Sequence, residues 1–173
     1  LSGGRVIGAD ALLSWGRPGF GLFQPDEFIP IAEESSLNSA VGCWVVQEVC
    51  RRGAQWCEQG GTIAINLSAR TLQQDDVVRV LSESLERTGI SPGQLTMEIT
   101  ETVLLSGTGA TSENLDRLRE LGVKLSIDDF GTWHSSLSQL QQTDVDVLKI
   151  DQSLAAPLDQ HASSAAIVSA IIP

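Results

Sequence analysis

The chain has 173 residues, the size of one domain, and 42% of them are hydrophobic, which is enough to build a sizeable core. Its 11 Lys and Arg residues against 22 Asp and Glu residues give a formal net charge of -11, which argues against sequence-independent binding to DNA or RNA through a basic surface. A small anionic ligand is compatible with this charge if divalent metal offsets the carboxylates around it.

Strands and helices alternate in the hydrophobic pattern. In the first half we predict strand 6–13, helix 25–34, helix 39–59, strand 62–68 and helix 72–88. In the second half we predict strand 95–100, helix 112–121, strand 124–129, helix 135–142, strand 144–151 and helix 163–172. This order predicts an α/β fold of βα units around a parallel sheet. No linker or boundary divides the chain, so we expect a single domain over residues 1–173.

Three cysteines, Cys43, Cys50 and Cys57, recur every seven residues within the predicted helix 39–59. Neighbours in this series lie roughly 10 Å apart along a helix axis, so no pair within the helix forms a disulfide. Burial on the apolar face is favoured over redox sensing or metal binding, and reduced thiols fit a cytoplasmic protein. No apolar run reaches the roughly 18 residues of a membrane span, and no signal peptide is visible.

Polar side chains interrupt the predicted strands, each toward the strand's C-terminal end. Parallel strands flanked by helices are nearly all apolar, yet Glu98 opposes Met97 and Ile99 in its strand. The polar residues that alternate with apolar neighbours in this way are Asp10, Asn66, Glu98, Asp128 and Lys149. In a closed barrel they would converge at the C-terminal mouth, where such barrels place their chemistry.

The carboxylates of Asp10, Glu98, Asp128 and Asp129 would repel one another at such a mouth without a cation. Oxygen ligands select a hard divalent ion, so we expect Mg²⁺ or Mn²⁺. Room for two ions favours phosphoryl-ester chemistry. Taken singly, each motif has a structural explanation: an Asp-Asp pair can form a turn, and a Glu-x-x-Glu pair can begin a solvated helix. Five polar residues in register on successive strands favour a functional site instead. An unrelated barrel enzyme could use Lys149 as a Schiff-base amine. This alternative is ranked lower, because it gives no role to the four carboxylates.

Four motifs make these positions specific: Asn66-Leu67-Ser68, Glu98-Ile99-Thr100-Glu101, Asp128-Asp129-Phe130-Gly131-Thr132 and Leu148-Lys149-Ile150-Asp151. With the stretch from Phe23 to Pro30, they resemble the EAL family, which hydrolyses cyclic di-GMP, over nearly the whole chain. The resemblance implies a TIM-like (β/α)8 barrel of the EAL type. Eight βα units need roughly 250 residues, so the barrel is incomplete here, with about five to six units.

The resemblance also implies residue roles. The implied ligands of two Mg²⁺ or Mn²⁺ ions are Asp10, Asn66, Glu98, Asp128 and Asp129. Lys149 would position the attacking water, Asp129 would share in catalysis, and Glu101 would brace the loop that begins at Asp128. The implied contacts to cyclic di-GMP are Leu12, Ser14 and Asn66.

The chain departs from the family at several of these positions. Asp10 stands where the family has Glu and is one methylene shorter, and a misplacement of about 1 Å can cost roughly a hundredfold in rate. Ser14 stands where the family usually has an Arg that grips phosphate, and it offers neither charge nor a bidentate fork. Trp133 replaces a Gly of the loop after Asp128 and removes backbone freedom there.

Two functions therefore stay open at the level of the sequence. The first is metal-dependent hydrolysis of cyclic di-GMP to the linear dinucleotide in bacterial second-messenger signalling. The second is a degenerate module that binds cyclic di-GMP or a protein partner without turnover. Because the chain begins at Leu1 without a Met, we expect it to belong to a longer protein with sensory or GGDEF domains. The unpaired edges of an open barrel also predict pairing with a second copy, as a homodimer.

Overall fold

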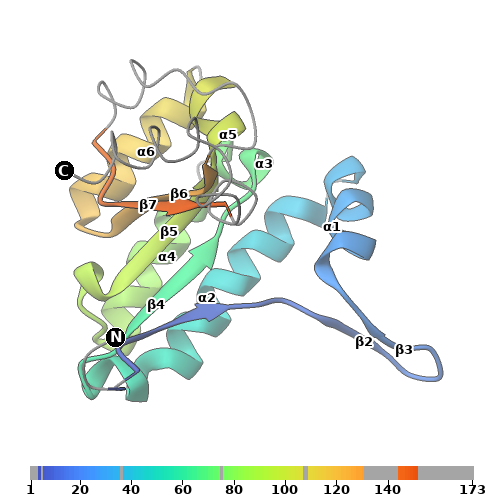
Figure 1. Cartoon of the computed structure of the whole chain (residues 1–173), viewed down its shortest axis with the longest axis horizontal. Coiled ribbons are helices and arrows are strands. Elements are labelled where there is room, and N and C mark those ends of the chain that lie inside the picture. The colour runs from blue at the N-terminus through green and yellow to red at the C-terminus, as the bar shows by residue number, and fades with distance from the viewer. Residues whose placement is uncertain are drawn as a thin grey trace, which may run out of the picture.

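The computed structural model describes residues 4, 6–35, 37–74, 76–106, 109–130 and 144–151. The predicted helices 135–142 and 163–172, together with Trp133, lie outside these residues. The described part is built on a curled parallel sheet with helices packed against it, from which a hairpin and one helix extend to the side (Figure 1). The predicted α/β class is confirmed.

Five parallel strands form the main sheet, in the spatial order β1-β4-β5-β6-β7. Their bounds are β1 Gly8–Ala11, β4 Thr62–Asn66, β5 Leu95–Thr100, β6 Lys124–Phe130 and β7 Val147–Ile150. The five strands follow one another in space in the same order as along the chain, and β2 and β3 belong to a separate hairpin. Each strand thus lies beside the next, as in one arc of a (β/α) barrel. Strand 6–13 was predicted too long, since only its middle pairs with β4.

The helices are α1 Pro25–Glu34, α2 Leu37–Glu58, α3 Ala69–Leu72, α4 Asp76–Thr88, α5 Glu101–Ser106 and α6 Ala110–Leu121, with a 3-10 turn, η1, at Pro92–Gln94. The predicted helix 72–88 begins too early, because α4 starts at Asp76 and Leu72 is the last residue of α3. Ser68 caps α3 by accepting a hydrogen bond from the backbone N of Thr71 at 3.2 Å. This cap starts a short helix, which ends at Leu72 before α4 begins at Asp76.

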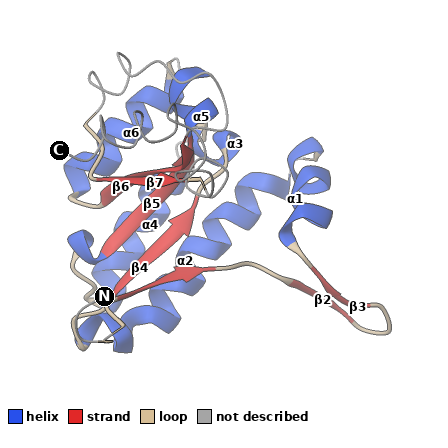
Figure 2. Cartoon of the chain, viewed as in Figure 1, coloured by secondary structure: helices blue, strands red, loops and turns tan. Residues whose placement is uncertain are grey.

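The sequence analysis missed an antiparallel hairpin between β1 and α1. Its strands, β2 Trp15–Arg17 and β3 Gly21–Phe23, are only three residues long, too short for an alternating pattern to be recognised. Gly19 and Gly21 take positive φ values of 81° and 94°, which the turn needs and which glycine adopts at little cost. The Trp15 ring lies 5.5 Å from that of Phe23 and 6.0 Å from that of Phe28 in α1. The hairpin is thereby joined to α1, away from the sheet (Figure 2).

The core lies between one face of the sheet and the helices behind it. Alternate residues of β4, β5 and β6 are buried there, namely Ile63, Ile65, Leu95, Met97, Ile99, Leu125 and Ile127. Each such side chain contributes about 1.5–3 kcal/mol relative to exposure. Helix α2 lies close to β4 because Gly53 has no Cβ, which would stand 2.1 Å from Ile63 Cδ1. Cys50 and Cys57 are buried and Cys43 is partly buried, all three as free thiols, so the predicted burial is confirmed for Cys50 and Cys57.

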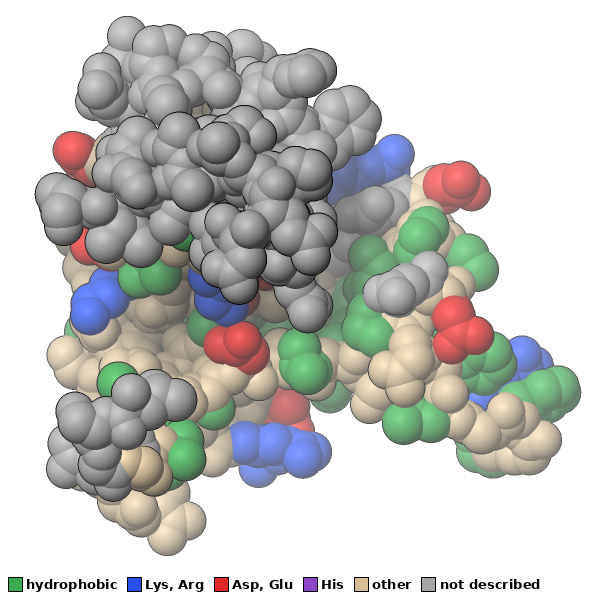
Figure 3. All heavy atoms as spheres, in the orientation of Figure 1, with side chains coloured by type: hydrophobic (Ala, Val, Ile, Leu, Met, Phe, Trp, Pro, Cys, Tyr) green, Lys and Arg blue, Asp and Glu red, His purple; other side chains and the backbone are tan. Residues whose placement is uncertain are grey.

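Apolar side chains are also exposed on the described surface. Ile7, just before β1, and Ile31 in α1 are each 67% exposed, and Leu12 after β1 is 82% exposed. Figure 3 shows hydrophobic side chains along the hairpin and α1. In the part of the chain that the structure describes, no strand pairs with the outer edge of β1. None of the helices described there has both the length and the apolar character needed to span a bilayer.

An unpaired strand edge flanked by exposed isoleucine and leucine favours association with another chain. We expect the 173-residue chain to elute above its mass of 18.5 kDa in size-exclusion chromatography with light scattering. Ile7→Lys should lower the apparent mass, because a charge at a strand edge opposes pairing. Ile31→Lys is the matched control, since this isoleucine is equally exposed but lies on α1. A monodisperse 18.5 kDa wild-type species would contradict the expectation.

Candidate active site

The parallel register brings the predicted polar residues to one end of the sheet. Asn66 on β4 lies beside Glu98 on β5, and Thr100 at the end of β5 lies beside Asp128 on β6. Glu98 is 1% exposed, while Asn66 is exposed. Because parallel strands end at the same edge, these side chains gather although their positions in the chain are far apart.

Lys149 on β7 joins two of the predicted carboxylates. Its Nζ lies 3.1 Å from Asp10 Oδ2 and forms an ion pair with Glu98 Oε1. Asp10 belongs to β1 and Lys149 to β7, the two outer strands of the sheet. This contact is within reach only because the sheet curls, so that its two edges approach one another across the concave face. The structure therefore brings Asp10, Glu98 and Lys149 together.

The pKa shifts in this cluster have clear causes. Burial raises the pKa of Glu98, the Lys149 ammonium opposes this, and the carboxylates of Asp10 and Asp128 add to the rise. Burial by itself lowers the pKa of Lys149, but its hydrogen bonds to Glu98 and Asp10 outweigh burial and the net shift is upward. Lys149 is therefore charged at neutral pH.

A bulge in β6 sets the position of the two consecutive aspartates. Ile127 pairs with Leu148 and Phe130 with Ile150, so two residues of β6, Asp128 and Asp129, face one residue of β7, Lys149. Asp129 has φ 55°, a left-handed conformation that costs a non-glycine residue about 1–2 kcal/mol. Bulges of this kind redirect side chains next to active sites.

The bulge also brings Asp129 into the field of its neighbours. Burial raises the pKa of Asp129, Asp128 and Asp151 raise it further, and Lys149 opposes them. A regular strand would send two consecutive side chains to opposite faces. The alternating pattern that placed Asp128 could therefore not place Asp129.

Glu101 lies close to this cluster in the chain, and two of the predicted ligand contacts share one pocket. Glu101 begins α5 directly after β5 and is 5% exposed, but the loop it was predicted to brace extends beyond the described residues. A pocket of about 570 Å³ opens at the ends of β1, β4 and β5, and Leu12 and Asn66 line it. This volume suits a small-molecule ligand.

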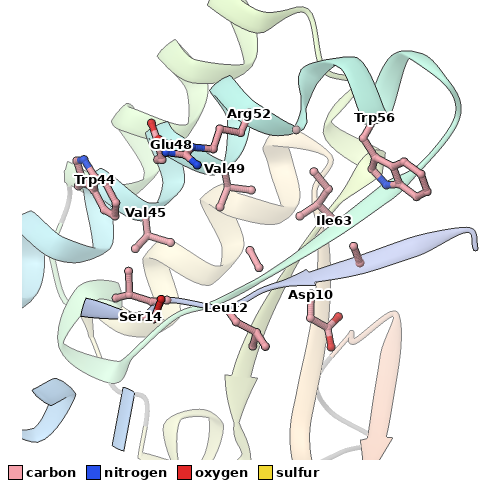
Figure 4. A pocket seen from close by; sticks show the side chains of 14 residues that line it. Asp10, Leu12, Ser14, Trp44, Val45, Glu48, Val49, Arg52, Trp56 and Ile63 are labelled. Atoms are coloured by element: carbon pink, nitrogen blue, oxygen red, sulfur yellow. Dashed lines mark hydrogen bonds and ion pairs between the residues drawn. The ribbon is translucent and has the colours of Figure 1, made fainter. Parts of the chain in front are cut away.

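Ser14 is exposed and lines a different pocket, of about 510 Å³, between the end of β1 and α2. Trp44 and Val49 of α2 line that pocket together with Asp10 and Leu12, and the Asp10 carboxylate points away from α2 (Figure 4). Leu12 lines both pockets, so the two lie next to each other at the end of β1, and Ser14 lines only the one of about 510 Å³.

Whether a divalent cation suits these residues depends on their donor atoms. Glu98 Oε2 is buried, and within the described residues nothing hydrogen-bonds to it. In the same part of the chain, no three Asp, Glu, His or Cys side chains lie close enough together to hold a metal ion by themselves. Mg²⁺ typically binds one or two carboxylates and completes its shell with water and ligand phosphate oxygens. The oxygen donors and the spare Glu98 oxygen fit such an ion.

Sequence reasoning missed Ser126. It lies beside Glu98 in the register of β5 and β6 and is fully buried, and its Oγ has no hydrogen-bond partner among the described residues. The same alternation that identified Asp128 also places Ser126 on the inner face, two residues earlier. A buried hydroxyl without a partner is unfavourable by about 1–3 kcal/mol, so a polar group at this position indicates a polar interior beside Glu98.

Comparison with known proteins gives consistent matches. A family model described as EAL domain matches residues 1–173. An uncharacterized signaling protein of Caulobacter vibrioides is 41% identical over 169 residues, which cover 98% of this chain and 21% of that protein. The bifunctional diguanylate cyclase/cyclic di-GMP phosphodiesterase MucR of Pseudomonas aeruginosa is 38% identical over 172 residues, 98% of this chain and 25% of that protein. The chain thus spans a quarter or less of these curated relatives.

Solved structures extend the match to the fold. The PaMucR phosphodiesterase in complex with c-di-GMP has a TM-score of 0.82 and 38% identity, over 94% of this chain and 67% of that chain. The EAL enzyme Bd1971, in a form with cAMP and cyclic-di-GMP bound, has a TM-score of 0.84 and 32% identity, over 96% and 47%. The curled sheet is therefore part of a TIM-like barrel of this type.

Because the pKa of Glu98 is raised, ionisation of this side chain should lower the stability of the folded protein, by an amount that depends on pH. An acid whose pKa is higher in the folded state binds more protons when folded, so stability falls as pH rises from its ordinary value, about 4.3, through the folded value. Without added metal, Glu98→Gln should therefore raise the melting temperature at pH 7. The gain should shrink toward pH 4, where wild-type Glu98 is protonated in both states.

Circular dichroism melts of both proteins from pH 4 to pH 8 measure this difference. Glu83→Gln is the control, because Glu83 is an exposed member of an ion pair on α4 and its replacement tests loss of surface charge alone. A melting temperature of Glu98→Gln below that of wild type at pH 7 would contradict the prediction.

Proposed function

Because the chain belongs to the EAL domain family, we propose that it hydrolyses a phosphodiester bond of cyclic di-GMP to give the linear dinucleotide, with Mg²⁺ or Mn²⁺. The observation that carries this proposal is the contact of Lys149 with Glu98 and Asp10 at the ends of parallel strands. Its neighbours Asn66, Asp128 and Asp129 complete an oxygen-rich surface there. The c-di-GMP complex of a 38% identical phosphodiesterase supports the choice of ligand.

The proposed metal ligands are Asp10, Asn66, Glu98, Asp128 and Asp129. When bound, divalent ions supply positive charge that offsets the carboxylates and the charge that builds on the phosphate. Glu98 contributes a buried, well-oriented carboxylate, because packing on β5 limits its movement. The bulge keeps Asp128 and Asp129 close to the same region, at the expense of backbone strain.

Lys149 acts in this proposal as a hydrogen-bond donor. Its pKa is raised, so at neutral pH it carries a proton and cannot accept one. It can hold a water molecule or a phosphate oxygen in position by donating to it, which favours reaction by orientation. The proton of an attacking water must then pass to a carboxylate, and Asp129 at the bulge is the residue we assign to that step, while Glu101 supports the adjoining loop.

The pocket at the strand ends is the proposed ligand site. Its volume of about 570 Å³ lies within the usual range for small-molecule sites. Leu12 offers an apolar surface, and Asn66 offers an amide that can both donate and accept hydrogen bonds. We propose that these two residues contact cyclic di-GMP.

Binding without turnover is the second candidate function, and particular residues favour it. Asp10 replaces the family's Glu, and Ser14 replaces its phosphate-gripping Arg. Ser14 also lines the pocket of about 510 Å³ and not the adjacent pocket that Asn66 lines. One assay separates the two functions: cyclic di-GMP is incubated with the protein and Mg²⁺ or Mn²⁺, and the linear product is measured by chromatography. Binding without product would favour the second function, and neither binding nor product would exclude both.

We further propose the setting of this domain from its relatives. The matched region is 25% or less of the two curated proteins, one of which is named as bifunctional with a diguanylate cyclase. We propose that this domain likewise works beside a sensory or cyclase (GGDEF) domain, in the cytoplasm, and as a homodimer.

A metal-dependent site predicts a metal-dependent melting temperature. Millimolar Mn²⁺ or Mg²⁺ should raise the melting temperature of the wild type, because an ion that binds only the folded state stabilises it. Asp128→Asn should abolish the increase, since an amide oxygen is a weaker ligand than a carboxylate. Asp116→Asn on α6 is the control, because this exposed aspartate pairs with Arg119 away from the site. An unchanged wild-type melting temperature would contradict the proposal.

Ser14 predicts a gain of function. Ser14→Arg should tighten cyclic di-GMP binding by roughly tenfold, because an arginine adds a charge-assisted, bidentate contact to phosphate. Calorimetric titration of both proteins without added Mg²⁺ or Mn²⁺, so that the proposed turnover does not occur, measures the change. Arg at a distant exposed position, as in Ser91→Arg, controls for added charge. Equal affinities of wild type and Ser14→Arg would show that Ser14 is not what weakens the site.

A further inference from the structure

We infer that Lys149 is an internal counter-cation that competes with divalent metal for Glu98 and Asp10, so that metal binding releases the Lys149 ammonium toward the ligand. This inference rests on the metal-dependent function proposed above. It adds an order of events, because the lysine that holds the carboxylates together becomes a donor to the ligand only after metal has replaced it there.

The contacts of Lys149 use the same oxygens that a hard cation prefers. Its Nζ pairs with Glu98 Oε1 and lies 3.1 Å from Asp10 Oδ2. A magnesium ion binds carboxylate oxygen at roughly 2.0–2.1 Å, closer than the 3.1 Å that separates the Lys149 nitrogen from Asp10 Oδ2. An ion at this carboxylate pair would therefore occupy the space that the ammonium fills and would repel its charge.

Burial explains why Glu98 needs one cation or the other. Its side chain is 1% exposed, and a buried carboxylate is strongly unfavourable without a cation. Lys149 supplies a single positive charge to a region that also contains Asp10, Asp128 and Asp129. A divalent ion supplies twice that charge, so the carboxylates favour the exchange.

A second arrangement competes with this one, because Glu98 Oε2 has no hydrogen-bond partner among the described residues. In it, metal binds this oxygen while Lys149 keeps its contacts with Glu98 Oε1 and Asp10 and acts as a fixed strut, a side chain that holds the two carboxylates in place. The two arrangements differ in what Lys149 does when metal binds. In the first it leaves both carboxylates, and in the second it does not move.

The composition of the chain makes this measurable. It contains two lysines, Lys124 and Lys149, so lysine labelled with ¹³C at Cε gives two NMR signals. Lys124 is exposed at the start of β6 and serves as the internal control. During titration with Mg²⁺ we expect the Lys149 signal to move toward the position of the exposed Lys124 signal, which itself stays in place. A Lys149 signal unchanged at saturating Mg²⁺ would overturn the inference.

A variant tests the competition itself. Lys149→Met keeps a long side chain without charge, and it should bind Mn²⁺ more tightly than wild type by on the order of tenfold, because a competing charge is gone. Lys124→Met is the matched control and should bind as wild type does. Calorimetric titration measures all three affinities. Equal or weaker binding by Lys149→Met would overturn the inference, since a strut that orders the carboxylates predicts weaker binding.

The two experiments also separate this inference from the proposed function. Wild-type protein that binds neither Mg²⁺ nor Mn²⁺ would contradict the proposed metal site and the inference with it. Wild-type protein that binds metal with an unmoved Lys149 signal would contradict the inference alone. If Lys149→Met does not fold, the NMR titration of the wild type still decides between displacement and a fixed strut.

Discussion

A buried carboxylate, Glu98, is the constraint on which the rest of the site depends. Its charge must be balanced inside a strand that is otherwise packed with apolar side chains, and Lys149 balances it from two strands away. The same ammonium reaches Asp10 on the opposite outer strand. One side chain thus connects the first strand, the central strand and the last strand of the sheet, and this is feasible only on a curled sheet whose edges approach each other.

One face of the sheet contributes mainly to stability, and the other contains the residues of the proposed site. The face toward the helices is apolar, and its buried side chains supply the favourable free energy of folding. The concave face contains features that are unfavourable for stability: a desolvated carboxylate, a buried serine hydroxyl without a partner among the described residues and a left-handed aspartate in a bulge. Proteins tolerate such features where function requires them and the surrounding packing holds them in place.

The departures from the family have unequal consequences in this structure. Asp10 is one methylene shorter than the family's Glu, yet its carboxylate still contacts Lys149, so it remains part of the cluster. Ser14 has no comparable contact among those that the structure describes, and it lines a pocket next to the one that Asn66 lines. Of these two departures, Ser14 therefore bears more directly on ligand affinity, whereas Asp10 bears on the geometry of the carboxylates.

The sequence by itself determined the order of the strands of the main sheet and of the longer helices, the inner-face position of Glu98 and Asp128 and the family, because alternation within a strand and short motifs are local properties. Only the tertiary structure decided the hairpin, whose three-residue strands are too short to give a pattern, and the bulge that positions Asp129, which depends on the register with β7. It also decided the pairing of Asp10 with Lys149, residues 139 positions apart. That contact follows from the curl of the whole sheet, which no segment of the sequence specifies alone.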